Sequence, residues 1–221
     1  MDCSASDAAG NSASGSFDVT VVDTTAPSLT LPANITTAAS SISGAVVTYS
    51  ASASDLVDGS VGVSCSPASG STFAPGTTTV NCSASDAASN TAAGSFTVTV
   101  NFSVGGFYQP VDMTPAGSPT VWNTVKNGST VPLKFEVFAG STELTDIAAV
   151  NQPLRATGVT CAGGTADDIE LLASGATSLR YDTSGGQFIY NWQTPKKVGA
   201  CYRVTVSMID GSSLSAYFKL K

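Results

Sequence analysis

Carboxylates are the side chains of this sequence with the clearest potential for chemistry. The 221 residues carry 16 acidic and nine basic side chains and no histidine, giving a net charge of −7. The first 100 residues hold seven of the acids, all aspartate, and neither lysine nor arginine. The seven are Asp2, Asp7, Asp18, Asp23, Asp55, Asp58 and Asp86. Carboxylates that gather without a neutralising cation favour a hard metal ion such as Ca²⁺, which prefers oxygen ligands.

The lack of histidine excludes several classes of function. Ser–His–Asp and Cys–His nucleophile pairs, HExxH zinc sites and histidine pH switches all require an imidazole. The acidic net charge argues against nucleic acid, because its binders gather Lys and Arg on one surface. No apolar run reaches the 18 or so residues that span a bilayer, and no signal segment follows Met1. We therefore expect a non-enzymatic protein without membrane insertion.

The first half of the chain contains an internal repeat. Residues 3–21 return as residues 82–100, with 15 of 19 positions identical. This spacing predicts one complete repeat over residues 23–101 and the C-terminal fragment of a preceding repeat over residues 1–22. Residues 102–221 form a third segment, in which acidic and basic side chains balance and both tryptophans lie.

The two larger segments have the pattern of short strands. Residues 46–54, 61–66, 77–85 and 95–100 are rich in Val, Thr and Ser, with turn signals such as Asp58-Gly59 between them. In the third segment, apolar residues alternate along residues 131–137, 188–192, 202–208 and 216–220. These patterns predict an all-β fold of two tandem immunoglobulin-like antiparallel β-sandwiches, preceded by a truncated hairpin.

The repeat resembles a known family, the hyalin repeat (HYR), an extracellular immunoglobulin-like module. The resemblance covers residues 1–100 and rests on Asp23-Thr-Thr-Ala-Pro27, Ala53-Ser-Asp-Leu-Val-Asp-Gly59 and the segment from Cys65 to Cys82. In the Asp-x-x-Gly-Asn turn of the family, Ser89 replaces the glycine that the first copy keeps as Gly10. The resemblance implies an extracellular, secreted or cell-surface location.

Residues 102–221 resemble the PxKF domain of secreted bacterial proteins. The matching segments are residues 107–112, 123–128 and 190–194 and the motif Pro132-Leu-Lys-Phe135. This resemblance implies a bacterial secreted or surface context and assigns no chemistry.

The five cysteines follow the same segments. Each larger segment has one pair, which predicts disulfides Cys65–Cys82 and Cys161–Cys201 and leaves Cys3 unpaired. Disulfides indicate an oxidising, extracellular compartment. The alternative is buried free thiols. Zinc is disfavoured, because the sequence has no C-x-x-C pair and no histidine.

The predicted sandwich brings part of the acidic charge together. The loop after its second strand, with Asp55 and Asp58, and the loop before its last strand, with Asp86 and Asn90, lie at one end. The linker enters there with Asp23. Two interpretations stay open. The five residues are ligands of a calcium site at the junction between the repeats, or each aspartate caps its own turn through backbone amides.

The third segment contains weaker candidates. The acidic residues at 167, 168 and 170 suggest a catalytic acid cluster, although neighbouring acids in a connector are usually solvated. Phe188, Tyr190 and Trp192 suggest a sugar-stacking platform, although such a stripe on an amphipathic strand is usually core. An amide crosslink between Lys134 and Asn191 is disfavoured, because Lys134 alternates away from the core-facing residues of its strand.

Asn34 and Asn101 begin glycosylation sequons, whose use depends on the host.

Two function classes follow. The preferred one is a structural or adhesive module of a large secreted or cell-surface bacterial protein, whose partners are neighbouring repeats of the same polypeptide. The alternative is recognition of a glycan or protein by the aromatic-rich third segment.

The N-terminal hairpin is predicted to need a partner. Phe17, Val19 and Val21 would leave an apolar face on it, so we expect residues 1–22 to pack on the next repeat or to pair with a second molecule.

Overall fold

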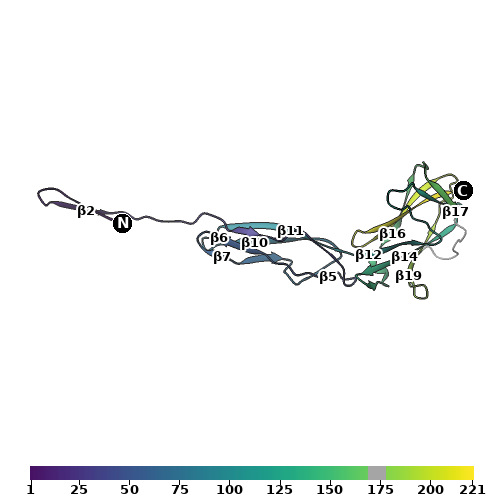
Figure 1. The fold of residues 1–221 in the computed structure, drawn as a ribbon, viewed down its shortest axis with the longest axis horizontal. Helices are drawn as coiled ribbons and strands as arrows, with labels where there is room; N and C mark the ends of the chain where they lie inside the picture. Colours follow the sequence, from purple (N-terminus) through teal and green to yellow (C-terminus); the bar gives the residue numbers. More distant parts are fainter. Residues whose placement is uncertain (169–177) are drawn as a thin grey trace. The chain divides into compact units, whose positions relative to one another are not determined.

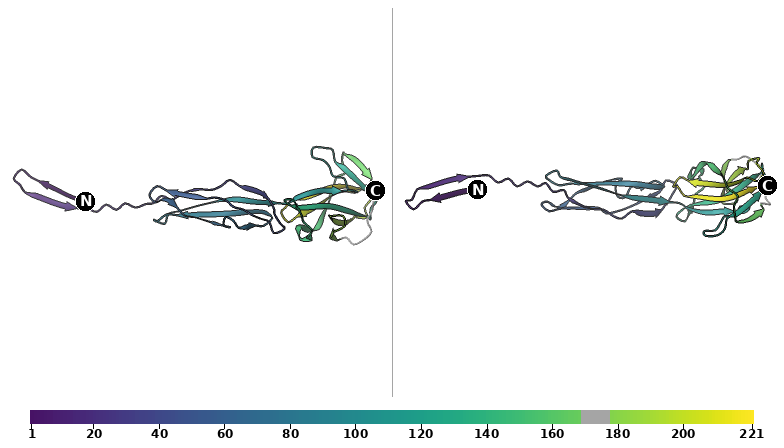
Figure 2. Two further views of the ribbon diagram at one scale, coloured as in Figure 1. Left: turned by 60° about the horizontal axis from the view of Figure 1, so that its bottom comes forward. Right: turned by 90° about the horizontal axis from the view of Figure 1, so that it is seen from above.

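Strands dominate the structure, which is a computed structural model describing residues 1–168 and 178–221 (Figure 1). Figure 2 shows the same strands in two further views. The described residues form one short 3₁₀ helix, η1 (Ile147–Ala149), but no α-helix. The predicted all-β fold class is therefore confirmed. None of the described residues forms a helix that is long and apolar enough to cross a membrane. The chain forms two compact units, residues 1–31, 50–66 and 81–95 and residues 32–49, 67–80 and 96–221.

The N-terminal residues form the predicted hairpin. Strands β1 (Asp2–Ser6) and β2 (Ser12–Ser16) pair in antiparallel fashion, with Asp2 opposite Ser16. Strand β2 ends at Ser16, and residues 17–22 belong to no strand. All of residues 1–22 are exposed, including Val19 and Val21. Pairing of this apolar segment with a second molecule stays a prediction.

Residues 23–101 form nine strands, as far as the described chain shows. These are β3 (Ser28–Thr30), β4 (Ile35–Ala38), β5 (Ala45–Val46), β6 (Ser52–Asp55), β7 (Gly59–Val61), β8 (Val63–Ser66), β9 (Thr72–Phe73), β10 (Gly76–Ser85) and β11 (Thr91–Asn101). The strand orders are β4-β11-β10-β8 and β3-β6-β7, and β5 pairs with β9. Side chains on β10 and β11 alternate between the core and the exterior, as the period of two requires. The buried ones include Val80, Ala84, Phe96, Val98 and Val100.

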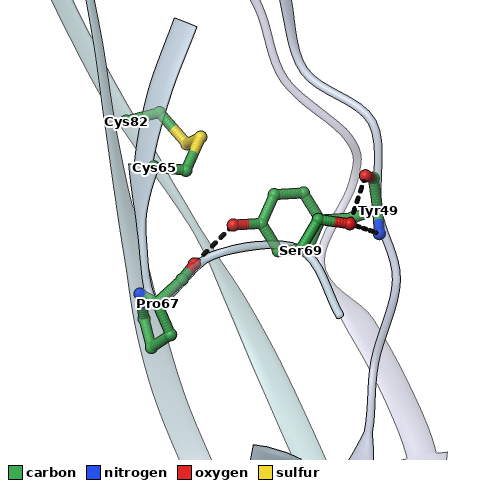
Figure 3. Close-up of a disulfide and its surroundings, with 5 residues drawn as sticks. All are labelled: Tyr49, Cys65, Pro67, Ser69 and Cys82. Carbon is green, nitrogen blue, oxygen red and sulfur yellow. Dashed lines mark hydrogen bonds between the residues drawn. A yellow bond between two sulfur atoms is a disulfide. The ribbon is translucent and has the colours of Figure 1, made fainter. Parts of the chain in front are cut away.

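A tyrosine interrupts the strand predicted over residues 46–54. The Tyr49 hydroxyl donates a hydrogen bond to the Pro67 carbonyl, and the Tyr49 ring packs edge-on against Phe96 at 4.9 Å between centroids. Ser69 Oγ accepts from the Tyr49 amide and donates to its carbonyl, both at 2.8 Å (Figure 3). These side-chain bonds satisfy the backbone that a neighbouring strand would otherwise pair, so β5 ends before Tyr49 and β6 begins after it.

Residues 102–221 form two further sheets. Their strands are β12 (Ser103–Tyr108), β13 (Val121–Val125), β14 (Thr130–Ala139), β15 (Thr142–Glu143), β16 (Val150–Val159), β17 (Thr165–Asp168), β18 (Leu179–Asp182), β19 (Gln187–Gln193), β20 (Cys201–Met208) and β21 (Ser213–Leu220). One sheet has the order β12-β14-β19-β18 with β15 beside β14, and the other has the order β16-β20-β21-β13-β17. The rings of Trp192 on β19 and Phe218 on β21 lie 4.8 Å apart between the two sheets. The alternating apolar residues therefore form one core between two sheets, as predicted.

The sheets are not purely antiparallel, which corrects one detail of the predicted fold. Strand β11 runs parallel to β4, and β13 runs parallel to both β21 and β17. Parallel neighbours need a long connection between them, and the strands of each of these pairs are far apart in sequence. The period of two identifies the buried face of a strand but carries no information about the direction of its partner.

Ser89 has a backbone conformation that favours glycine. Its φ is 71°, the only positive value outside glycine in residues 1–168 and 178–221, and Gly10 in the equivalent turn has a φ of 86°. We expect Ser89→Gly to raise the free energy of unfolding by up to about 1 kcal/mol, because the Cβ strain disappears. Thermal unfolding measures this change. The control is Ser60→Gly at an exposed position of β7, which should lower stability, because glycine weakens a strand. A lower melting temperature for Ser89→Gly would contradict the prediction.

Candidate metal centre

Four aspartates meet in the first unit of the chain. One carboxylate oxygen from each of Asp23, Asp55, Asp58 and Asp86 lies within 4.8 Å of the other three. Asp23 precedes β3, Asp55 ends β6, Asp58 lies in the turn before β7, and Asp86 follows β10. The structure thus brings together the four aspartates among the five residues that the sequence suggests as calcium ligands, and the fifth, Asn90, contacts two of them. We call this group the carboxylate cluster.

The turn between β6 and β7 positions two of these side chains. Asp55 Oδ1 accepts hydrogen bonds from the backbone amides of Val57 at 2.8 Å and Asp58 at 3.2 Å. These amides hold the pKa of Asp55 below its ordinary value, so the carboxylate is charged at neutral pH. Asp58 Oδ2 in turn accepts the amide of Ala87 at 2.8 Å and so bonds this turn to the loop after β10.

Asn90 holds the other two aspartates in place. Its backbone amide donates to Asp86 Oδ1 at 2.7 Å, and its side-chain Nδ2 donates to Asp86 Oδ2 at 2.8 Å. The same Nδ2 lies 3.3 Å from the backbone carbonyl oxygen of Asp23. Asn90 therefore contacts two members of the cluster through its amide nitrogen, which orients them.

Residues 7–11 form the same turn outside the cluster. Asp7 accepts hydrogen bonds from the backbone amide and Nδ2 of Asn11, both at 2.8 Å, although both residues are exposed. The bonds between Asp86 and Asn90 are therefore a local property of the Asp-x-x-x-Asn sequence. Turn capping, the alternative explanation for these aspartates, accounts for both carboxylate oxygens of Asp86.

Turn capping accounts for Oδ1 of Asp23 and Asp55 but not for their Oδ2 atoms. Asp55 is 8% exposed, and its Oδ2 is buried without a hydrogen-bond partner. Asp23 uses Oδ1 to accept the Thr25 amide at 3.0 Å, while its Oδ2 is also buried without a partner. A buried carboxylate oxygen without a partner is costly, so each of these atoms calls for a positively charged or hydrogen-bonding group.

The dimensions of the cluster suit Ca²⁺. Calcium binds six to eight oxygens at about 2.3–2.6 Å, so opposite oxygens of one coordination shell lie about 5 Å apart. The four carboxylate oxygens fall within that limit. No lysine or arginine occurs in the first 100 residues to neutralise them. The arrangement can therefore hold a hard cation through oxygen ligands from three segments of the chain.

The aromatic stripe of the third segment lies in the core. Phe188, Tyr190 and Trp192 are 0, 9 and 5% exposed, so they do not form a surface for sugar stacking.

The two residues of the disfavoured amide crosslink lie on the paired strands β14 and β19. Lys134 lies opposite Ile189, on the face of β14 away from Leu133, and Asn191 lies opposite Pro132.

Among the acids suggested as a catalytic cluster, Asp167 shares a hydrogen bond with Asp112. This bond, together with burial, raises the pKa of Asp112 above its ordinary value. Glu170 lies outside the described residues.

Both predicted disulfides are present. Cys65 on β8 is bonded to Cys82 on β10, directly opposite in the register (Figure 3). Cys161 is bonded to Cys201, the first residue of β20. Cys3 is exposed and free.

The solved structures similar to this chain include titin domains and a desmocollin ectodomain, at TM-scores below 0.5. A crystal structure of the titin domains z1z2 in complex with telethonin has 13% sequence identity, covers 90% of this chain and 98% of its own, and has a TM-score of 0.31. The ectodomain of human desmocollin-1 has 12% identity, covers 89% of this chain and 42% of its own, and has a TM-score of 0.26. No curated protein matches the chain. Residues 22–100 match the family model of the HYR domain, the hyalin-repeat family that the sequence of this segment resembles.

Proposed function

We propose that residues 23–101 form a calcium-stabilised structural module of an extracellular adhesive protein. The observation that carries the proposal is the pair of buried, unpartnered Oδ2 atoms of Asp23 and Asp55 within the carboxylate cluster. Asp23, Asp55, Asp58 and Asp86 would supply the ligands, and Asn90 would orient Asp86 and Asp23. A bound Ca²⁺ would connect the linker before β3 to two loops and so restrict the entry of the chain into the module.

The wider context of the proposal comes from the disulfides and the family match. Two disulfides support an oxidising compartment outside the cell. The match of residues 22–100 to the HYR domain supports a structural or adhesive role without catalysis. The resemblance of residues 102–221 to the PxKF domain supports a secreted or cell-surface bacterial protein. The recurrence of residues 3–21 as residues 82–100 supports neighbouring repeats of the same polypeptide as partners.

Calcium titration of the chain tests this function. After treatment with EDTA, we expect CaCl₂ to produce a binding heat and to raise the melting temperature of one unfolding transition. At about 100 times the dissociation constant the stabilisation is about 3 kcal/mol, which corresponds to roughly 10–20 °C for a module of this size. Asp55→Asn should abolish both effects, because it removes the buried charge while keeping the size of the side chain.

The matched control is Asp7→Asn. Asp7 makes the same type of turn as Asp86 but lies outside the carboxylate cluster, so this variant should bind calcium normally. Absence of both heat and thermal shift in the original chain would refute the proposal. So would equal losses in the Asp7 and Asp55 variants, because a general charge effect would then explain the result.

A further inference from the structure

Two arginines share the outer face of the sheet β16-β20-β21-β13-β17. Arg155 on β16 lies opposite Thr205 on β20, and Arg203 on β20 lies opposite Thr157 on β16. Residues opposite each other in an antiparallel pair project to the same face, so the two arginines are diagonal neighbours about 7 Å apart. Both are exposed, whereas the alternate residues of β20, such as Val204 and Val206, are buried.

The three strands next to the arginines, β16, β20 and β21, carry positive charge only. Strands β16, β20 and β21 contain Arg155, Arg203 and Lys219 and no acidic residue. In a chain with a net charge of −7, this is a local reversal of sign. Within the described part of the chain, neither guanidinium group has a hydrogen-bond or ion-pair partner, although both backbones pair in the sheet. Two neighbouring guanidinium groups without a partner favour an external anion with planar or tetrahedral oxygens.

An irregularity of β16 creates a groove beside the arginines. The register between β16 and β20 shifts between Asn151 and Arg155, so the residues between them leave the regular ladder. The resulting open groove has a volume of about 670 Å³ and is lined by residues 151–155 together with Arg203, Thr205 and Ser207. We call it the basic groove.

The lining of the basic groove is mostly polar. It presents two guanidinium groups, the amide of Gln152, the hydroxyls of Thr205 and Ser207, and the side chain of Asn151, whose Nδ2 already donates to the Met208 carbonyl at 2.8 Å. Thr205 and Ser215 hydroxyls lie 2.8 Å apart, which continues the row of hydroxyls onto β21. Hydroxyls act as both donors and acceptors, which matches the hydroxyl groups of a sugar. The partly exposed Tyr217 lies opposite Arg203 and adds a ring to the same face.

We propose that the basic groove binds an acidic polysaccharide through sulfate or carboxylate groups. Arg155 and Arg203 would bind the anionic oxygens, and the hydroxyl row would bind the neighbouring sugar hydroxyls. A polar groove of this kind suits a carbohydrate better than a peptide, which gains much of its affinity from apolar side-chain pockets. The site is independent of the carboxylate cluster and of the buried aromatic stripe.

Binding of defined polyanions tests the proposal. The probes are dextran sulfate, polygalacturonate, uncharged dextran and poly-glutamate, measured by surface plasmon resonance in buffer with EDTA. We expect at least one acidic polysaccharide to bind, with an affinity that falls as NaCl increases, and uncharged dextran not to bind. A preference for dextran sulfate identifies sulfate as the anion, and a preference for polygalacturonate identifies carboxylate. The double variant Arg155→Ala/Arg203→Ala should weaken binding by at least about tenfold, since each arginine makes a charge-assisted contact.

Arg180→Ala is the matched control. Arg180 is an exposed arginine on β18 of the other sheet, so its loss should change affinity less than twofold. Unchanged melting temperatures in all variants would show that the fold is intact, as expected for exposed side chains. The proposal is overturned if neither acidic polysaccharide binds, if the double variant binds as tightly as the original chain, or if poly-glutamate binds equally well.

Discussion

Replacing Cys161 and Cys201 together with alanine is expected to lower the free energy of unfolding by about 4 kcal/mol. The disulfide closes a loop with a sequence separation of 40 and attaches the chain after β16 to the start of β20. Without it, the unfolded chain gains the conformational freedom that the crosslink removes. The same change at Cys65 and Cys82, with a separation of 17, should cost about 3 kcal/mol. Urea unfolding under non-reducing conditions measures both values.

Cys3→Ala is the control for the cysteine substitutions. Cys3 is exposed and free, so its replacement should change stability by less than about 0.5 kcal/mol. If both double variants were as stable as this control, the disulfides would not stabilise the fold. If the shorter loop contributed more than the longer one, loop entropy would not be the main source of the stabilisation.

The two disulfides should differ in their effect on calcium. Cys65–Cys82 joins β8 to β10, and Asp86 follows the end of β10 directly after Ser85. Loss of this bond should therefore weaken calcium binding as well as stability. Loss of Cys161–Cys201 should leave calcium binding unchanged, because none of the four aspartates lies in residues 102–221.

The location of the carboxylate cluster could be predicted from the sequence because it depends on topology. Once residues 23–101 are recognised as a sandwich, the loops that carry Asp55 and Asp86 lie at the same end. The identity of the unpartnered oxygens could not be predicted. It depends on which carboxylate oxygen accepts the local amides, and on the packing that buries Asp55 at the end of β6.

The basic groove was not predictable from the sequence. Arg155 and Arg203 are 48 positions apart and belong to no local motif. They become neighbours only through the register of β16 on β20, and the groove beside them requires the shift in that register. A strand pattern states which face a residue occupies, whereas the partner strand and its register are set by long-range packing. Long-range packing also sets the direction of a partner strand, so the parallel pairing of β4 with β11 could not be predicted from the strand pattern.

The aromatic stripe was predicted to be either core or a ligand platform, and Phe188→Ala distinguishes these roles energetically. Phe188 is completely buried, stacks on Phe135 at 5.5 Å and contacts the edge of Tyr181 at 5.2 Å between ring centroids. We expect a loss of about 3–5 kcal/mol, because the substitution removes a large buried side chain and leaves a cavity between the sheets. Urea or thermal unfolding measures this loss.

Val198→Ala supplies the comparison for Phe188. Val198 is 74% exposed in the same half of the chain, so its truncation should cost less than about 0.5 kcal/mol. A surface platform would give the opposite pattern for Phe188, with little change in stability and a direct loss of carbohydrate binding. One result would identify the aromatic stripe, and not the basic groove, as the binding surface. In that result, Phe188→Ala keeps its stability but loses polysaccharide binding, whereas Arg155→Ala/Arg203→Ala still binds. Because the Phe188 ring has no exposed area, we expect stability to fall and any polysaccharide binding to follow the two arginines.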